Sequence, residues 1–279
     1  MMDLTIDPII ENALREDIGT GDITTDILIQ AGAKGLGYVV AKEALVPAGL
    51  AVAGRVFGLL DPQTVFTALC RDGDRIAAGT RVFEVEGDLA AILKGERTAL
   101  NFLQHLSGIA TVTRSWVDIL EGTRTRLVDT RKTMPGLRML EKYAVRVGGG
   151  HNHRIGLFDG VLIKDNHIVA CGGITEAVRR ARENVHHLIR IEVETATMEE
   201  VDEALAAGAD VIMLDNMDLS RIRKAIKHIN GRAVTEVSGS VDKQRLREIA
   251  EAGADIISAG FLTHSARAVD LSMRIVAGV

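Results

Sequence analysis

The spacing of hydrophobic positions differs between the two halves of the chain, and it changes near residue 113. In the first half, helical spacing over Pro8–Arg15 and Gly95–Thr113 is interrupted by strand-like runs over Leu36–Lys42 and Thr80–Val85. Turn-forming residues such as those at Pro47–Gly49 lie between these stretches. This mixture predicts a module of the α+β class.

The second half alternates between strand-like and helical patterns. Its short apolar runs are Arg126–Asp129, Val161–Lys164, Ile189–Val193, Val211–Leu214, Ala233–Val237 and Ile256–Ser258. Its amphipathic stretches are Thr175–Asn184, Met198–Ala207, Leu219–Ile229 and Asp242–Ala252. Thr197 and Glu200 form the residue pair of a capping box, and at Gly208 and Gly253 a helix gives way to a strand. Such alternation predicts an α/β fold, either a β/α barrel or a doubly wound sheet.

Polar residues or glycines stand at the carboxyl end of each predicted strand. They are Asp129, Arg131, Lys132, Lys164, Asp165, Glu194, Asp215, Asn216, Ser238, Gly239 and Gly260. Enzymes built on parallel barrels carry their active sites at this end of the strands. Six such ends with charges of both signs therefore predict a catalytic site at one edge of the sheet.

The composition indicates a globular protein and disfavours several other classes. With 279 residues, 47% hydrophobic and 25% charged, the chain has the composition of a globular protein and enough length to bury a core. An aromatic content of 3% disfavours a stacking platform for nucleic acid. The chain has no apolar run of ~20 residues, and its polar, acidic start is unlike a signal peptide. Because Cys70 and Cys171 are too few for a disulfide framework or a metal quartet, we expect reduced thiols and a cytoplasmic location, with no membrane or nucleic-acid partner.

Positive charge is concentrated in one stretch of an otherwise acidic chain. Eight Lys and Arg residues and two acidic residues lie between Arg124 and Arg154, whereas the whole chain carries a net charge of −5. A solvated, salt-bridged surface would give the same count, but it would not need the interleaved His151, His153 and glycines. An isolated basic region suits a small polyanion better than nucleic acid. We therefore expect a phosphorylated or carboxylated substrate.

The segment 129–167 holds most of the candidate cations. Arg131 and Lys132 directly follow the end of a predicted strand. The planar guanidinium of Arg154 suits a carboxylate or phosphate, and the ammonium of Lys164 is a compact positive charge. Arg131 and Lys132 follow the end of one predicted strand and Lys164 ends another, so we expect these cations, together with Arg154, to converge at one mouth of the barrel.

Two carboxylates and two small-residue turns complete the predicted site. Glu194 and Asp215 follow the next two strands and suit Mg²⁺, which takes a few carboxylates together with water and substrate oxygens. Both turns precede helices and can present backbone N–H groups to phosphate; their residues are Ser238, Gly239, Ser240, Ala259, Gly260 and Phe261. No P-loop and no glycine-rich dinucleotide motif is present, so those phosphate sites are excluded.

Long motifs follow one another along the chain. In order they are ALREDIGTGDITTD, ERTALNFLQHLSGIAT, DTRKTMPGLRMLEKYAVRVGGGHNHR, LFDGVLIKDNH, IEVE, IMLDN, EVSGS and ISAGFLTHS. Together they cover nearly the whole sequence and resemble the quinolinate phosphoribosyltransferase family. One departure is Met134, where the family usually has a second Thr, and we expect it to adjust the pocket wall and not the chemistry.

The resemblance implies a fold and a reaction. The fold is an N-terminal α/β sandwich domain over 1–112, completed by a C-terminal helix over 265–279, and an incomplete, open α/β barrel of TIM type over 113–264. The reaction transfers phosphoribosyl from 5-phosphoribosyl 1-pyrophosphate to quinolinate with decarboxylation, in the presence of Mg²⁺. The site is shared across a homodimer, and assembly into hexamers stays open.

The resemblance also assigns residues. The quinolinate-side positions are Arg131, Lys132, His153, Arg154 and Lys164. Arg97 matches an arginine contributed across the dimer interface, and Glu194 and Asp215 match carboxylates for ribose and Mg²⁺. The four catalytic positions are Lys132, Lys164, Glu194 and Asp215. The remaining substrate-binding positions are Thr130, Ser238, Gly239, Ser240, Ala259, Gly260 and Phe261.

Three other functions fit parts of the pattern. Lys164 at a strand end is compatible with a Schiff-base aldolase. His151 and His153 form an HxH pair that a metal-dependent hydrolase would use, although the following Arg154 makes it a poor cation site. A non-enzymatic sensor of phosphorylated metabolites is the third, since a relative associated with molybdenum transport shares the fold. The motifs quoted above favour the transferase.

Overall fold

A computed structural model describes residues 3–239 and 241–277. By their contacts these residues divide into two compact units. The first contains 3–114, 134–149 and 265–277, and the second contains 115–133, 150–239 and 241–264. The described helices include none long and apolar enough to cross a membrane.

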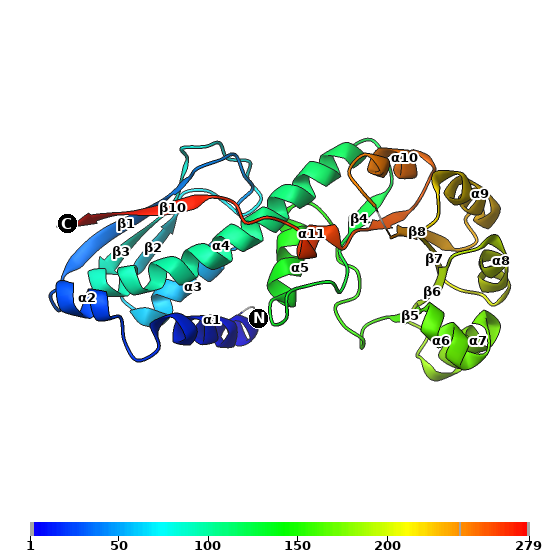
Figure 1. The fold of residues 1–279 in the computed structure, drawn as a ribbon, viewed down its shortest axis with the longest axis horizontal. Coiled ribbons are helices and arrows are strands. Elements are labelled where there is room, and N and C mark those ends of the chain that lie inside the picture. Colours follow the sequence, from blue (N-terminus) through cyan, green and yellow to red (C-terminus); the bar gives the residue numbers. More distant parts are fainter. Residues whose placement is uncertain (1–2, 240, 278–279) are drawn as a thin grey trace. The chain divides into compact units, whose positions relative to one another are not determined.

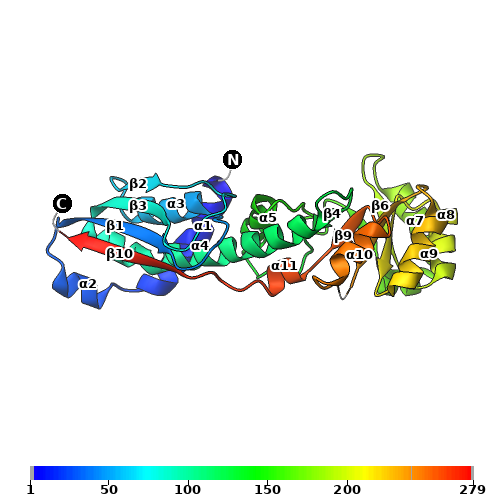
Figure 2. The same ribbon diagram turned by 90° about the horizontal axis from the view of Figure 1, so that it is seen from above.

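The first unit is built on an antiparallel sheet. Its strands, in sheet order, are β10 (Leu271–Ala277), β1 (Lys34–Ala41), β3 (Arg81–Asp88) and β2 (Val65–Ala68). Its helices are α1 (Asp3–Ile18), α2 (Ile23–Leu28), α3 (Leu50–Leu60), most of α4 (Leu89–Val117) and α5 (Arg138–Val147). Helix α3 lies against α1 and β2 (Figure 2). The core of this unit includes Phe57 and Phe83, whose ring centroids are 6.1 Å apart. The predicted α+β class of this half is confirmed.

The end of the chain forms a strand, so the helix expected over 265–279 is wrong. Strand β10 pairs antiparallel with β1, with Met273 opposite Val39 and Arg274 opposite Tyr38. Along β10 the more buried and the more exposed residues alternate, so that Leu271 is buried whereas Arg274 and Val276 are exposed. The physical reason is that β1 would otherwise be an edge, and pairing satisfies the backbone groups of both segments.

The second unit is built on a parallel sheet. Its strands, in sheet order, are β4 (Arg126–Val128), β9 (Ile256–Ser258), β8 (Val234–Ser238), β7 (Val211–Asp215), β6 (Ile191–Thr195) and β5 (Val161–Ile163). All neighbouring pairs are parallel, and within the described residues no ladder joins β4 to β5. The sheet is therefore an open α/β barrel, as expected.

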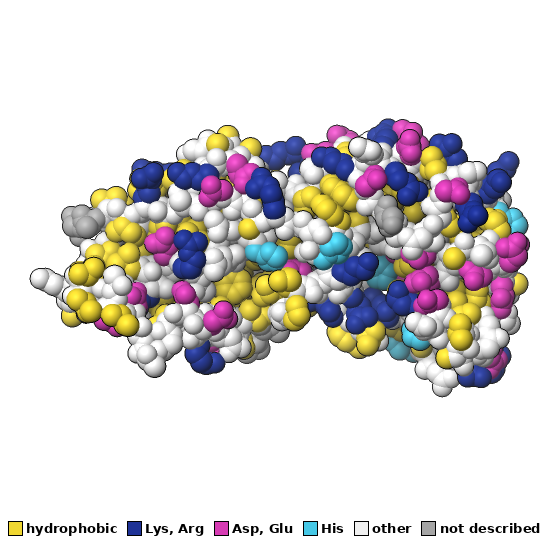
Figure 3. Space-filling view, in the orientation of Figure 1, with side chains coloured by type: hydrophobic (Ala, Val, Ile, Leu, Met, Phe, Trp, Pro, Cys, Tyr) yellow, Lys and Arg dark blue, Asp and Glu magenta, His cyan; other side chains and the backbone are white. Residues whose placement is uncertain are grey.

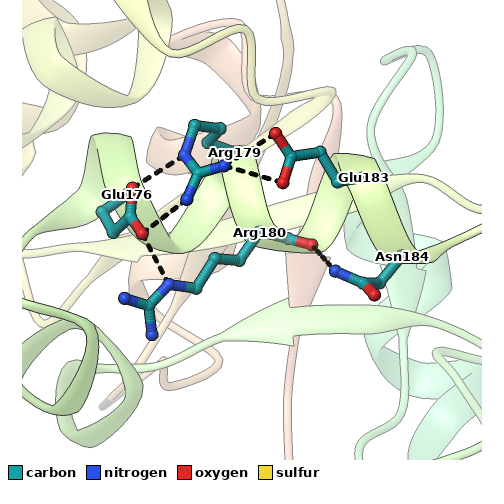
Figure 4. A network of polar contacts seen from close by, with 5 residues as sticks. All are labelled: Glu176, Arg179, Arg180, Glu183 and Asn184. Atoms are coloured by element: carbon teal, nitrogen blue, oxygen red, sulfur yellow. Dashed lines mark hydrogen bonds and ion pairs between the residues drawn. The ribbon is translucent and has the colours of Figure 1, made fainter.

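Helices follow the strands and cover the outer face of this sheet (Figure 1). They are α6 (Asp165–Cys171), α7 (Ile174–Asn184), α8 (Met198–Ala206), α9 (Leu219–Ile229), α10 (Arg245–Glu251) and α11 (Phe261–His264), preceded by a 3₁₀ turn over Asp118–Leu120. Most of them bury apolar side chains, such as Ile222, Ala225 and Ile229 of α9, whereas α6 has no buried residues. The outer face of α7 instead carries an ion-pair network of Glu176, Arg179, Arg180 and Glu183 (Figure 4).

Most predicted elements of the second unit are confirmed to within two residues. The capping box is present, because Thr197 accepts the N–H of Glu200 at 3.2 Å and Glu200 accepts the N–H of Thr197. Gly208 and Gly253 end helices with φ of 77° and 96°, values that favour glycine. The helix expected from Asp242 begins at Arg245, because the Asp242 carboxylate caps its first N–H groups.

Candidate active site

A cavity of about 780 Å³ opens at the carboxyl edge of the parallel sheet, and all of its lining belongs to the second unit. In that unit, Figure 3 shows Lys and Arg side chains gathered between β5 and the region of β4 and α11, with acidic and His side chains beside them. The predicted residues that line the cavity are Thr130, Arg131, Lys132, His153, Arg154, Lys164, Glu194, Asp215, Ser238, Gly239, Ala259, Gly260 and Phe261. The structure thus brings together nearly all of the predicted site.

Strand geometry explains why these residues meet. Successive side chains of a strand point to opposite faces, so residues two apart share a face. The residues here called the upper layer line the cavity at or just after the carboxyl ends of the strands, and they are Lys164, Glu194, Asp215, Ser238 and Gly260. Two residues earlier along the chain are the residues here called the lower layer, Leu162, Glu192, Met213, Glu236 and Ser258. In the sheet Leu162 lies opposite Glu192 and Met213 lies opposite Glu236. Both layers belong to the inner face of an open barrel.

The four cations differ in their exposure. Arg131, Lys132 and Lys164 are exposed, whereas Arg154 is half-buried. Its Nη1 donates to the carbonyl of Gly160 at 2.9 Å, which fixes the plane of the guanidinium. Burial, together with the like charge of Arg131, lowers the pKa of Arg154. Arg154 is therefore the cation best prepared to gain from an anionic ligand.

The two strand-end carboxylates are half-buried and lie on neighbouring strands. Glu194 accepts a hydrogen bond from the Lys164 ammonium at 2.8 Å, and Asp215 accepts one from the side-chain amide of Asn216 at 2.7 Å. Two carboxylates beside open space for water and phosphate oxygens are the donor set that Mg²⁺ prefers. The residues present therefore fit a magnesium ion.

The two small-residue turns have different backbone roles. Gly239 has φ of 81°, and a side chain there would collide with Asn216, so glycine is needed. A side chain at Gly260 would lie 2.7 Å from Cδ of Lys132. The N–H of Ala259 donates to the carbonyl of Val128, so Ala259 lines the cavity with its N–H already bonded. Ser240, also predicted, lies outside the described residues.

Two buried glutamates belong to the site, and the sequence analysis missed both. Glu236 is 2% exposed and Glu192 is 7% exposed. Nε2 of His153 lies 3.1 Å from Glu192 and 3.6 Å from Glu236. Burial first, and then the charge of Glu192, raise the pKa of Glu236 to about 8, while His153 and the hydroxyl of Ser258 act in the opposite direction. The period of two along β6 and β8, counted back from Glu194 and Ser238, is the signal that would have found them.

Two candidate residues lie outside this cavity. Arg97 is an exposed residue of α4 in the first unit. His151 is exposed and uses its backbone to bridge to β4, so the HxH pair does not converge on one point. Among the described residues, His153, Glu192 and Glu236 form a group of three His and acidic side chains whose ligand atoms lie within 4.8 Å of one another.

An open parallel barrel with cations and carboxylates at its carboxyl edge defines an enzyme class that handles small polyanions. Two family models identify it further. The model for the quinolinate phosphoribosyl transferase C-terminal domain matches residues 109–274, and the model for the N-terminal domain matches residues 22–107. The chain belongs to the quinolinate phosphoribosyltransferase family.

Individual relatives are similar over almost their full length. A probable nicotinate-nucleotide pyrophosphorylase (carboxylating) of Bacillus subtilis is 46% identical over 98% of this chain and 94% of its own. A chloroplastic nicotinate-nucleotide pyrophosphorylase (carboxylating) of Arabidopsis thaliana is 42% identical over 96% of this chain and 82% of its own. Among solved structures, NadC from Streptococcus pyogenes has a TM-score of 0.95 at 43% identity, covering 99% of this chain and 98% of its own.

Proposed function

We propose that this chain is a carboxylating nicotinate-nucleotide pyrophosphorylase. It transfers phosphoribosyl from 5-phosphoribosyl 1-pyrophosphate to the ring nitrogen of quinolinate, and releases pyrophosphate, CO₂ and nicotinate mononucleotide. The observation that carries the proposal is the cavity of the second unit, where four cations and two strand-end carboxylates meet in a chain of this family. Both substrates are polyanions, and such a cavity neutralises both.

The residues support the transfer step by position and charge. Arg131, Lys132 and Arg154 face the two carboxylates of quinolinate, and the 238–239 turn faces the 5′-phosphate. As the ring nitrogen attacks the anomeric carbon, positive charge develops on the ribose, and the carboxylates of Glu194 and Asp215 stabilise it. Glu194 and Asp215 would also hold a Mg²⁺ ion, which would supply charge neutralisation for the pyrophosphate. Holding both substrates in line contributes the rest of the rate.

The second step needs no covalent cofactor. The new pyridinium withdraws electrons, so the bond between C2 and its carboxylate breaks with the electron pair left on C2. CO₂ leaves, and C2 then takes one proton from water. The ammonium of Lys132 or Lys164 stabilises the carbanion by its charge while it lasts.

The proposal also includes an oligomeric state and a cellular location. A homodimer would bring Arg97 of a second copy to the cavity, which fits an exposed arginine on a helix of the first unit. The expected cytoplasmic location belongs to the same proposal.

The geometry disfavours two of the three rival functions, the aldolase and the hydrolase. Lys164 is exposed and pairs with Glu194 at 2.8 Å, whereas a Schiff-base lysine needs a desolvated pocket or a neighbouring cation. A hydrolytic HxH site is disfavoured because His151 does not line the cavity. A sensor would bind the same anions without turning them over.

The experiment is a product assay with purified protein, quinolinate, 5-phosphoribosyl 1-pyrophosphate and Mg²⁺. Nicotinate mononucleotide should accumulate, stop when EDTA removes the metal, and resume when Mg²⁺ is restored. Binding of both substrates without product would instead support the sensor.

A further inference from the structure

The lower layer of the barrel contains a buried acid pair that the transfer chemistry does not use. Glu192 of β6 and Glu236 of β8 lie within reach of the same His153 Nε2. Oε1 of each glutamate is buried and makes no hydrogen bond to any described residue. Two adjacent carboxyl groups in this environment are costly to bury.

The stability of the fold does not explain why Glu192 and Glu236 are buried together. Apolar residues lie directly opposite both glutamates on the neighbouring strands, Leu162 opposite Glu192 and Met213 opposite Glu236, so this part of the sheet accommodates apolar side chains. Replacing a buried polar pair by apolar side chains of similar volume is often neutral or stabilising. A buried acid pair that persists at such a place therefore indicates a functional constraint.

The hydrogen bonds of His153 show what the pair does to the ring. Nδ1 accepts the backbone N–H of Arg154 at 2.7 Å, so the ring proton is on Nε2. Nε2 then donates to Glu192 at 3.1 Å. A metal ion at this point would need the Nε2 lone pair, which the proton occupies, and the cluster therefore favours a proton over a cation.

The ring is one link in a chain that reaches the substrate cavity. Asp129, after β4, accepts the backbone N–H of His153 at 2.9 Å. The ring holds the backbone of Arg154, and the guanidinium of Arg154 is fixed on the Gly160 carbonyl at 2.9 Å. The acid pair fixes the orientation of the ring, and the ring fixes the residue that carries the half-buried cation.

We propose that Glu192 and Glu236 are positioning residues, which hold His153 in its Nε2–H tautomer and thereby place Arg154 against a carboxylate of the pyridine substrate. This rests on the proposed function for the identity of that substrate. Neither glutamate is proposed to touch it.

The test compares methionine and glutamine at both positions. Methionine keeps the length of the side chain and removes the hydrogen bonds, whereas glutamine keeps a hydrogen-bonding group. Glu192→Met and Glu236→Met should raise KM for quinolinate roughly 10- to 100-fold, because misplacement of a binding group by about 1 Å costs up to about 100-fold. KM for 5-phosphoribosyl 1-pyrophosphate should change by less than about 3-fold, and so should both constants in the glutamine variants.

A matched control and two physical readouts separate positioning from folding. Glu203→Met removes the same charge from the outer face of the unit, where Glu203 accepts from Thr175, and should leave both KM values unchanged. Thermal unfolding should show that the methionine variants are as stable as the parent or more so. ¹⁵N shifts of His153 should report the Nε2–H tautomer in the parent and a loss of this preference in Glu192→Met.

Three results would overturn the inference. One is a parent that turns over quinolinate while the methionine variants match Glu203→Met in both KM values. Another is an equal rise in KM for the two substrates, together with lowered stability, which indicates a structural role. The third is a stoichiometric divalent metal that the parent retains and both methionine variants lose. Failure of the proposed function is distinct, because the parent itself would then form no nucleotide.

Discussion

Replacing Arg154 by methionine should weaken the use of quinolinate more than replacing Arg131, an exposed cation of the same cavity. Arg154 is half-buried, and its guanidinium is fixed on the Gly160 carbonyl at 2.9 Å. Loss of a partly desolvated charge partner costs about 2–3 kcal/mol, the lower part of the range for buried charge pairs. At about 1.4 kcal/mol per decade, kcat/KM for quinolinate should fall about 30- to 150-fold.

The comparison variant is Arg131→Met, because Arg131 lines the same cavity but is exposed. Ion pairs of exposed groups are worth about 1 kcal/mol or less, so this variant should lose at most about 5-fold in kcat/KM. Arg154→Lys keeps the charge without the planar fork and should fall between the two. Initial rates over a range of quinolinate concentrations measure all three. Equal losses in Arg154→Met and Arg131→Met would refute the argument from burial.

Three further predictions follow from the same geometry. The parent should prefer quinolinate to nicotinate by at least ~100-fold in kcat/KM, because nicotinate lacks one charge partner worth about 2–5 kcal/mol; comparable values would mean that the cations serve phosphate alone. Mixing Arg97→Ala with Lys132→Ala chains should restore some activity, because a heterodimer has one site with both residues; no recovery after verified subunit exchange would contradict a shared site. Glu236, with a pKa of about 8, keeps a proton between about pH 4.5 and 8 that the unfolded chain releases. The stability of the parent relative to Glu236→Gln should therefore fall as the pH rises through this window and level off above it, as measured by urea unfolding, and a difference that is constant with pH would show that Glu236 is ionised throughout.

The upper layer of the site could be predicted from the sequence because its charged residues interrupt the apolar pattern of the strands. Lys164, Glu194 and Asp215 each follow an apolar run, and the carboxyl ends of parallel strands meet at one edge. Glu192 and Glu236 lie inside strands, where an isolated polar residue reads as one of the alternating outward positions. Counting back two residues from Glu194 and from Ser238 places them instead on the inner face of the sheet.

The end of the chain illustrates a second limit. The strand over Leu271–Ala277 exists because β1, more than two hundred residues earlier, offers it backbone partners. Local periodicity carries no information about such a partner. The proposed role of Arg97 would depend in the same way on a second copy of the chain.

The most direct measurement follows the two carboxylates of quinolinate separately. Quinolinate labelled with ¹³C in the 2-carboxylate or in the 3-carboxylate is turned over with 5-phosphoribosyl 1-pyrophosphate, and CO₂ and nucleotide are measured together. The account predicts one labelled CO₂ for each nicotinate mononucleotide from the first substrate, and full retention of the label in the nucleotide from the second. Release of a nucleotide that keeps both carboxylates, or of CO₂ without nucleotide, would contradict it.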